Sequence, residues 1–202
     1  MDAEFFRHFG MYVKRGFLSD EACSRLIAGA RAATSKPATV RERHANVVDD
    51  DYRRTRIADV PADAVALVSE MLMGLRPSLD RHFHVTTTGC RTPEFLVYRP
   101  GDFFRAHADS VPSGAERDDI VTGRLISTIV FLNGESPASA PGSFTGGALG
   151  FYGLVDDPRA QDREFPLTGE PGLLVAFRPD IVHRVAPVTA GERFTIVTWF
   201  ER

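Results

Sequence analysis

The feature that most constrains the fold is a series of short runs rich in β-branched and aromatic residues. They begin near residue 94 and are separated by Gly, Pro, Asp and Ser, which is typical of strands joined by turns. Seven runs are expected to be strands: residues 94–99, 103–109, 125–133, 148–153, 172–178, 182–187 and 193–200, with a weaker candidate at 164–167. Seven or eight short strands after two helices favour a double-stranded β-helix, a jelly-roll barrel whose two sheets enclose a pocket.

The first ninety residues have a different, helical pattern. Ser19 is suited to an N-cap and is followed by acidic residues, so a helix is expected over residues 21–34. A second helix is expected to begin at Pro61, a residue suited to a first helical turn. Residues 35–60, between the two, are charged and look irregular. We therefore predict a mainly β fold with N-terminal helices (α+β), a jelly roll supported by two or more helices.

Length and composition narrow the class of protein. The 202 residues fit a single domain, 1–202, with helical support in 1–90 and a jelly-roll catalytic core in 91–202. A formal net charge of −3 argues against a nucleic-acid partner. Cys23 and Cys90 form no C-x-x-C pair and are expected to be free thiols in a reduced cytosol. No signal peptide or membrane span is recognisable, so a soluble, cytoplasmic protein without a membrane partner is expected. Oligomeric state is left open.

Three residues have the pattern of a metal site. His107 and Asp109 alternate on an extended segment, so their side chains share one face. His183 comes much later, among apolar neighbours. Two histidines and one carboxylate make the facial triad of non-heme Fe(II) oxygenases, which leaves coordination positions open for cosubstrate and dioxygen. Neutral imidazoles and an ionised Asp109 would leave the bound ion a positive charge for an anionic 2-oxo acid.

An anionic cosubstrate also needs a cation for its far carboxylate, and Arg193 is the candidate. Its guanidinium is always charged and can bind a carboxylate with two hydrogen bonds. A turn within residues 188–192 predicts that the strands of His183 and Arg193 form an antiparallel hairpin, with both side chains facing the barrel interior. Thr195 lies two residues beyond Arg193, so it shares that face and could add a hydrogen bond.

These residues resemble a known family. The spacing Tyr98-x-x-Gly101-x-x-Phe104-x-x-His107-x-Asp109 is similar to the first signature of the prolyl 4-hydroxylase branch of the Fe(II)/2-oxoglutarate dioxygenases. Residues 124–133, 146–151, 171–177 and 183–199 resemble the strands that follow, and 18–27 resembles the opening helix. The resemblance implies iron ligands at His107, Asp109 and His183. It also implies that Arg193 binds the distal carboxylate of 2-oxoglutarate, with Tyr98 as a hydrogen-bonding neighbour.

The same resemblance implies an activity. An enzyme of this kind uses Fe(II), 2-oxoglutarate and O2, with ascorbate as a candidate reductant, to hydroxylate an aliphatic C–H bond and release succinate and CO2. Asp109 favours hydroxylation, because related halogenases lack this carboxylate. Arginine at position 193, where collagen-type members usually have lysine, and Phe104 and Val130, where tyrosine is common, leave the substrate open. Prolyl residues in a protein or peptide, free amino acids and small natural-product intermediates are all candidates.

Two other functions compete with this interpretation. Oxidative demethylation of alkylated bases is disfavoured, because those relatives have a second arginine where this chain has Trp199, and because the chain is acidic. A non-catalytic, cupin-like metal-binding barrel would use an H-x-H and a glutamate, and neither accompanies His107.

Several other segments are given structural or loop roles. His82 and His84 are expected to be a solvated or locally hydrogen-bonded pair, and Arg53-Arg54-Thr-Arg56 a solvated surface paired with the acidic residues before it. Residues 110–123 and 133–147 are expected to be long loops at the pocket mouth that determine substrate choice.

Overall fold

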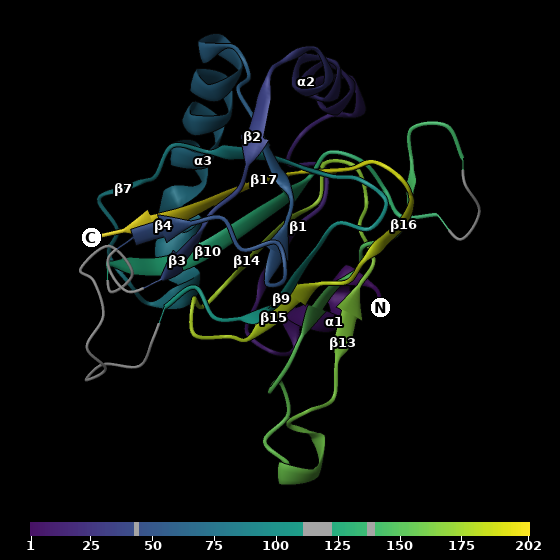
Figure 1. The fold of residues 1–202 in the computed structure, drawn as a ribbon. Helices are drawn as coiled ribbons and strands as arrows, with labels where there is room; N and C mark the ends of the chain where they lie inside the picture. Colours follow the sequence, from purple (N-terminus) through teal and green to yellow (C-terminus); the bar gives the residue numbers. More distant parts are fainter. Residues whose placement is uncertain (43–44, 111–122, 137–139) are drawn as a thin grey trace.

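Two antiparallel sheets form the body of the protein in the computed structural model, which describes residues 1–42, 45–110, 123–136 and 140–202 (Figure 1). The larger sheet contains, in spatial order, β1 (Tyr12–Lys14), β14 (Leu174–Phe177), β10 (Arg124–Phe131), β17 (Arg193–Glu201), β8 (Glu94–Tyr98), β6 (Arg56–Ala58) and β2 (Ser35–Pro37), with β7 (Gly89–Cys90) beside β17. The smaller sheet contains β13 (Phe165–Leu167), β12 (Leu149–Phe151), β15 (His183–Val185), β9 (Phe103–His107) and β5 (Arg53–Arg54). Two-stranded pairs join β11 (Phe144–Gly146) to β16 (Val188–Gly191) and β3 (Val40–Glu42) to β4 (Ala45–Val47).

The helices begin where the sequence predicts. Ser19 caps α2 (Asp20–Ala32), and its hydroxyl accepts a hydrogen bond of 3.2 Å from the backbone N–H of Ala22. The long helix α3 (Ala62–Phe83) starts directly after Pro61. Both lie over one face of the larger sheet (Figure 1). A short helix α1 (Ala3–Arg7) and the 3-10 turn Pro158–Ala160 were not predicted.

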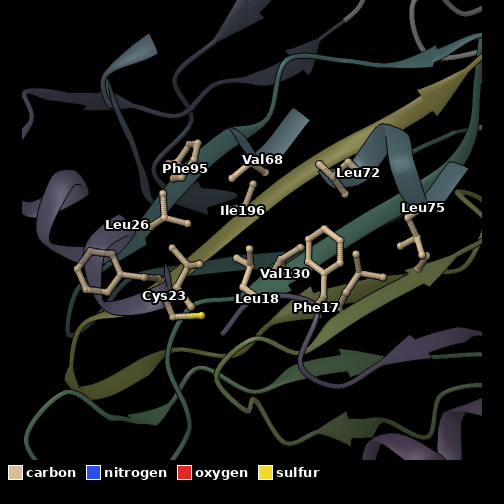
Figure 2. Close-up of a cluster of buried hydrophobic side chains, with 14 of the residues drawn as sticks. Phe17, Leu18, Cys23, Leu26, Val68, Leu72, Leu75, Phe95, Val130 and Ile196 are labelled. Carbon is tan, nitrogen blue, oxygen red and sulfur yellow. The ribbon is translucent and has the colours of Figure 1, made fainter. Parts of the chain in front are cut away.

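One hydrophobic core fills the space between these helices and the larger sheet. Figure 2 shows Leu26 of α2 and Val68 and Leu72 of α3 close to Val130 and Ile196 of the central strands. Burying each such side chain contributes roughly 1.5–3 kcal/mol. This core anchors the helices, so the opposite face of the larger sheet is left for the smaller sheet.

A second core lies between the two sheets. Strand β8 divides its residues between the cores, because side chains alternate along a strand: Phe95 and Val97 face the helices, whereas Leu96 and Tyr98 face the smaller sheet. From the smaller sheet, Phe151 of β12 contributes to this inner core. The mainly β architecture with a few helices is therefore confirmed. A strand overlaps each of the eight runs predicted between residues 94 and 200.

Some predictions were wrong. Residues 35–60 are not irregular, because β2, β5 and β6 extend both sheets: β6 pairs with β8, β2 pairs with β6 and β5 pairs with β9, which satisfies their backbone groups. The predicted loop 133–147 contains β11, which pairs with β16. The strands of His183 and Arg193 do not form a hairpin, since β15 belongs to the smaller sheet and β17 to the larger one. Most of the predicted loop 110–123 lies outside the described residues.

Two expectations from composition can be compared with the structure. Cys23 and Cys90 are free thiols, as predicted. Within the described ranges, none of the helices combines the length and apolar character required to cross a membrane.

Candidate metal and carboxylate site

Strand pairing brings the three predicted metal ligands together. His183 on β15 lies directly opposite His107 at the end of β9, and these strands run side by side in Figure 1. Asp109 follows two residues later, and each of its carboxylate oxygens is 3.8 Å from the Nε2 atom of one histidine. All three ligand atoms lie within 4.8 Å of one another. A metal ion bound by such atoms is about 2 Å from each of them, so this spacing is close to that of a coordination site.

Backbone carbonyls set the orientation of both imidazoles. The Nδ1 atom of His107 is 2.8 Å from the carbonyl oxygen of Arg105, and that of His183 is 3.0 Å from the carbonyl oxygen of Ile181. A carbonyl can only accept, so each Nδ1 carries the proton and each Nε2 keeps a free lone pair toward Asp109. Burial, together with the neighbouring His183, lowers the pKa of His107 to about 3. His107 is therefore neutral at pH 7, the form that binds a metal.

Asp109 is held in its ionised form. Burial alone would raise the pKa of this carboxyl, whose side chain is 10% exposed, but the two histidines and hydrogen bonds from Ser127 and Trp199 hold it below its usual range. The Ser127 hydroxyl donates to Oδ2 over 2.7 Å. Two neutral nitrogens and one carboxylate are a donor set suited to a divalent transition metal with open coordination positions.

A second cluster surrounds Arg193 on the inner face of β17. Arg193 lies opposite Tyr98 in the sheet and is only 1% exposed. Its guanidinium carbon is 5.0 Å from the ring centres of both Tyr98 and Phe131, and 5.8 Å from that of Phe144. The Nη1 atom donates to the Thr195 hydroxyl over 3.3 Å. Nε and Nη2 are buried and find no acceptor among the residues that the structure describes.

This cluster fits a carboxylate ligand. Burial lowers the pKa of Arg193 to about 10, which still leaves the guanidinium charged at neutral pH. A buried cation with two unused donors is costly unless an anion pairs with it, and a carboxylate matches the guanidinium geometry. Gly147 keeps space beside the side chain, because a Cβ there would lie 3.1 Å from Cδ of Arg193 and 2.8 Å from Cγ2 of Val188.

One cavity of about 580 Å³ contains the metal cluster and reaches the second cluster at Tyr98. His107, Asp109, His183 and Tyr98 all line it. Arg193 and Thr195 are not part of this lining, but the Arg193 guanidinium contacts the Tyr98 ring and donates to Thr195. The six predicted site residues therefore form two adjacent groups. Further residues on the cavity wall were not predicted as site residues, namely Tyr52, Arg53, Arg124 and Trp199.

Three residues that sequence reasoning missed support Asp109. Ser127 and Trp199 lie opposite each other in β10 and β17; the Ser127 hydroxyl donates to the carboxylate, and the Trp199 side chain helps to lower its pKa. Arg124 donates to the Asp109 carbonyl over 3.1 Å and lies over the Trp199 ring, 3.8 Å from its centre. A serine within the apolar strand 125–133 was the available signal, because an isolated polar residue facing a core needs a partner.

The two packed sheets and the His-Asp-His cluster beside a buried arginine are the features of a mainly β, metal-dependent oxygenase. A model of the 2OG-Fe(II) oxygenase superfamily matches residues 93–201, which is more than half of the chain. The protein belongs to this superfamily and is an oxidoreductase of the dioxygenase type. The matched region contains all six predicted site residues.

Known proteins with related sequence or fold include hydroxylases. A PKHD-type hydroxylase of Maricaulis maris (strain MCS10) is 33% identical over 102 residues, which is 50% of this chain but 38% of that relative's length. A prolyl-4-hydroxylase of Pseudomonas putida has a TM-score of 0.70 at 22% identity, covering 98% of this chain and 96% of its own. A Trichoplax adhaerens prolyl hydroxylase, in complex with a peptide of the hypoxia inducible factor, has a TM-score of 0.72 at 18% identity, with coverages of 98% and 86%. At these identities the two structures establish a shared fold.

Proposed function

We propose that the protein is an Fe(II)- and 2-oxoglutarate-dependent hydroxylase that oxidises an aliphatic C–H bond, with release of succinate and CO2. The observation that carries this proposal is the buried Arg193, which has two unused donors and contacts Tyr98 on the wall of the cavity that contains His107, Asp109 and His183. One group offers metal ligands and the other a carboxylate site. 2-Oxoglutarate, a chelating 2-oxo acid with a distal carboxylate, has chemistry that suits both.

Each residue of the chain has a defined task in this proposal. Fe(II), when bound by His107, Asp109 and His183, would supply the site at which dioxygen and the 2-oxo acid react. Arg193 would pair with the distal carboxylate, and Thr195 would hold the guanidinium in place through Nη1. Tyr98 would form the wall between the two groups. Ascorbate as the reductant rests on the family resemblance alone.

The substrate that we propose is a prolyl residue or an amino-acid-like molecule, presented as a peptide or as a free small molecule. The support is the shared fold with prolyl hydroxylases and the sequence similarity to a PKHD-type hydroxylase. We further propose that residues 1–202 act as one domain in which the two packed sheets constitute the jelly roll. Because Cys23 and Cys90 are free thiols, we propose a reducing compartment.

The base-demethylase alternative finds less support. The position of the second arginine in those relatives is occupied by Trp199, which lies opposite Ser127 and helps to lower the pKa of Asp109. A net charge of −3 also gives no general attraction to a phosphate backbone.

The test is succinate formation by purified protein supplied with Fe(II), 2-oxoglutarate and air. We expect slow succinate release without substrate, dependent on added Fe(II) and absent in Asp109→Ala. Metal analysis of both proteins should show about one iron per wild-type chain and much less in the variant. Wild-type succinate release that does not exceed that of Asp109→Ala, at matched protein and iron concentrations, would refute the proposed chemistry.

A further inference from the structure

Arg53 is buried on the wall of the metal cavity. The sequence places it in a run of arginines that resembles a solvated surface, but in the structure it is only 9% exposed. Pairing between β5 and β9 puts Arg53 opposite Phe104, which turns its side chain into the cavity that contains His107 and Asp109. Arg54, the next residue, points to the opposite side and is exposed.

The charge of Arg53 has no counter-ion in the described part of the chain. Two other arginines line the same cavity, and each lies near a carboxylate: Arg91 Nε is 2.5 Å from Glu201, and Arg124 Nη1 is 3.8 Å from Asp109. Arg53 instead donates Nη1 to the carbonyl of Thr39 over 3.0 Å.

The remaining donors of Arg53 are unused. Its Nε atom is buried without an acceptor among the described residues, and no acceptor there pairs with Nη2. The acidic residues of the cavity wall, Asp49, Glu94 and Asp109, form no ion pair with it within the described ranges. Arg53 thus has the same features as Arg193: a buried guanidinium, an aromatic contact and unused donors.

Arg53 lies on the side of the metal ligands and not beside the candidate cosubstrate site at Arg193. Its guanidinium carbon lies 4.6 Å from the centre of the Phe104 ring, and that ring stacks on the His107 imidazole at 3.6 Å. Only one aromatic ring therefore connects Arg53 to a metal ligand. Arg193, by contrast, lies behind Tyr98 on the other sheet. A ligand held by Arg53 would share the cavity with the metal without competing for the carboxylate site at Arg193.

We propose that Arg53 binds a carboxylate of the substrate, so that the molecule hydroxylated is a carboxylic acid rather than an uncharged compound. This proposal rests on the hydroxylase function proposed above. An always-charged guanidinium with free donors matches a carboxylate, and a partner anion removes the cost of burying the charge alone. A cavity of about 580 Å³ has room for an amino acid derivative or the end of a peptide.

The test compares acids with their amides. Protein loaded with Mn(II), which accepts the same nitrogen and oxygen ligands as Fe(II), and with 2-oxoglutarate is titrated calorimetrically with N-acetyl amino acids, including N-acetylproline, and with the corresponding carboxamides. We expect at least one acid to bind the wild type about 10- to 100-fold more tightly than its amide, the range for hydrogen bonds to a charged group. Arg53→Met should reduce that ratio to about one, and Arg53→Lys should keep part of it. Arg54→Met is the matched control and should retain the wild-type ratio.

The outcomes separate the two proposals. Acids that bind no better than their amides, or a panel in which nothing binds, would overturn the assignment of Arg53. So would an Arg53→Met variant that weakens acid and amide equally, since that result means a structural role. Should Arg53→Met fail to fold, Arg53→Gln keeps a donor for Thr39 without the charge and serves the same comparison. Failure of the protein to take up Mn(II) and 2-oxoglutarate, measured before the panel is added, would instead refute the hydroxylase function, and this proposal with it.

Discussion

Replacement of Arg193 by methionine should weaken 2-oxoglutarate binding strongly while leaving the ligand-free protein about as stable as the wild type. Most substitutions of a buried residue this large cost several kcal/mol of stability. Arg193 should differ because its buried charge is itself unfavourable until an anion arrives. The prediction therefore separates a ligand-binding arginine from one that holds the fold together.

The expected effect of Arg193→Met on stability follows from the pKa of Arg193. Burial lowers the pKa of Arg193 from its ordinary value to about 10 in the folded protein, which corresponds to an unfavourable free energy of about 3 kcal/mol. Because the folded pKa is the lower one, this penalty is present in full at neutral pH and fades only as pH rises above about 10 toward the pKa of the unfolded chain. Methionine removes the penalty and keeps a flexible apolar chain among the surrounding rings.

The interactions lost with the guanidinium nearly balance the stability gained by removing the buried charge. The hydrogen bond to Thr195 is worth about 1 kcal/mol, and the contacts with the rings of Tyr98, Phe131 and Phe144 together about 1–2 kcal/mol. We expect a net change within about 1 kcal/mol, which for a chain of this size moves Tm by no more than about 4 °C. The loss of the ligand carboxylate's partner should cost roughly 3 kcal/mol of 2-oxoglutarate affinity, or about 100-fold.

The assay combines thermal unfolding with calorimetric titration of 2-oxoglutarate into Mn(II)-loaded protein. Arg31→Met is the matched control. The guanidinium carbon of Arg31, a half-exposed residue of α2, lies 5.1 Å from the ring centre of Phe194, and Phe194 is on the face of β17 opposite to Arg193. It should alter neither quantity. Arg193→Lys should retain part of the affinity. A ligand-free Arg193→Met protein that unfolds more than about 10 °C below the wild type, or one with unchanged 2-oxoglutarate affinity, would refute the reasoning.

Three further predictions concern the metal and its surroundings. His107→Ala, Asp109→Ala and His183→Ala should each abolish iron retention and succinate formation with the circular dichroism spectrum unchanged; near-normal succinate release by two of them would exclude the proposed ligand set. Ser127→Ala removes the 2.7 Å bond to Asp109 and should weaken metal affinity about 10- to 100-fold in a chelator competition; equal affinity would mean that the serine only packs. Gly147→Ala forces a side chain onto a backbone with φ of +66° and into Val188 and Arg193, so it should lower stability by roughly 1–3 kcal/mol and also weaken 2-oxoglutarate binding. A stability loss with unchanged binding would contradict the second part.

The strands of the two sheets could be predicted because their sequences are locally consistent. The run 125–133 is rich in β-branched residues. The strand found there, β10 (Arg124–Phe131), begins one residue earlier and ends two residues earlier than predicted. Ser19 and Pro61 likewise mark the helix starts through local chemistry, which depends little on the rest of the chain. For these strands and helix starts, the signal lay within a few consecutive residues, and the prediction was confirmed.

The edge strands could not be found in this way. β2, β5 and β6 contain two or three residues each and are rich in charge. Such strands have no hydrophobic period of their own. They form because β8, β9 and then β6 present unpaired backbone groups to β6, β5 and β2, respectively. The hairpin expected between His183 and Arg193 failed for a related reason: five residues with a turn can join strands of one sheet or cross to another, and here β16 intervenes and pairs with β11.

The candidate site could be predicted only where several of its residues form a recognisable chemical pattern in the sequence. His107, Asp109 and His183 share a metal-ligand pattern, so their meeting in space was expected. Arg53 was interpreted as surface, because an arginine beside acidic residues is normally solvated. Its burial depends on which face of β5 meets Phe104, and this is a matter of register that the sequence does not specify.

Strand β17 shows how the alternation of a strand combines stability and chemistry. Its even-numbered residues Phe194, Ile196 and Phe200 pack against the helices in the outer core. Its odd-numbered residues face the smaller sheet and include Arg193 beside the candidate carboxylate site and Trp199 against Asp109. Nearly every position is buried, so hydropathy alone cannot distinguish the two faces. Chemistry can, because a core strand gains nothing from a charge or an indole donor unless a partner is present. Substitutions at even positions should therefore change the free energy of unfolding, whereas those at odd positions should change ligand and metal binding.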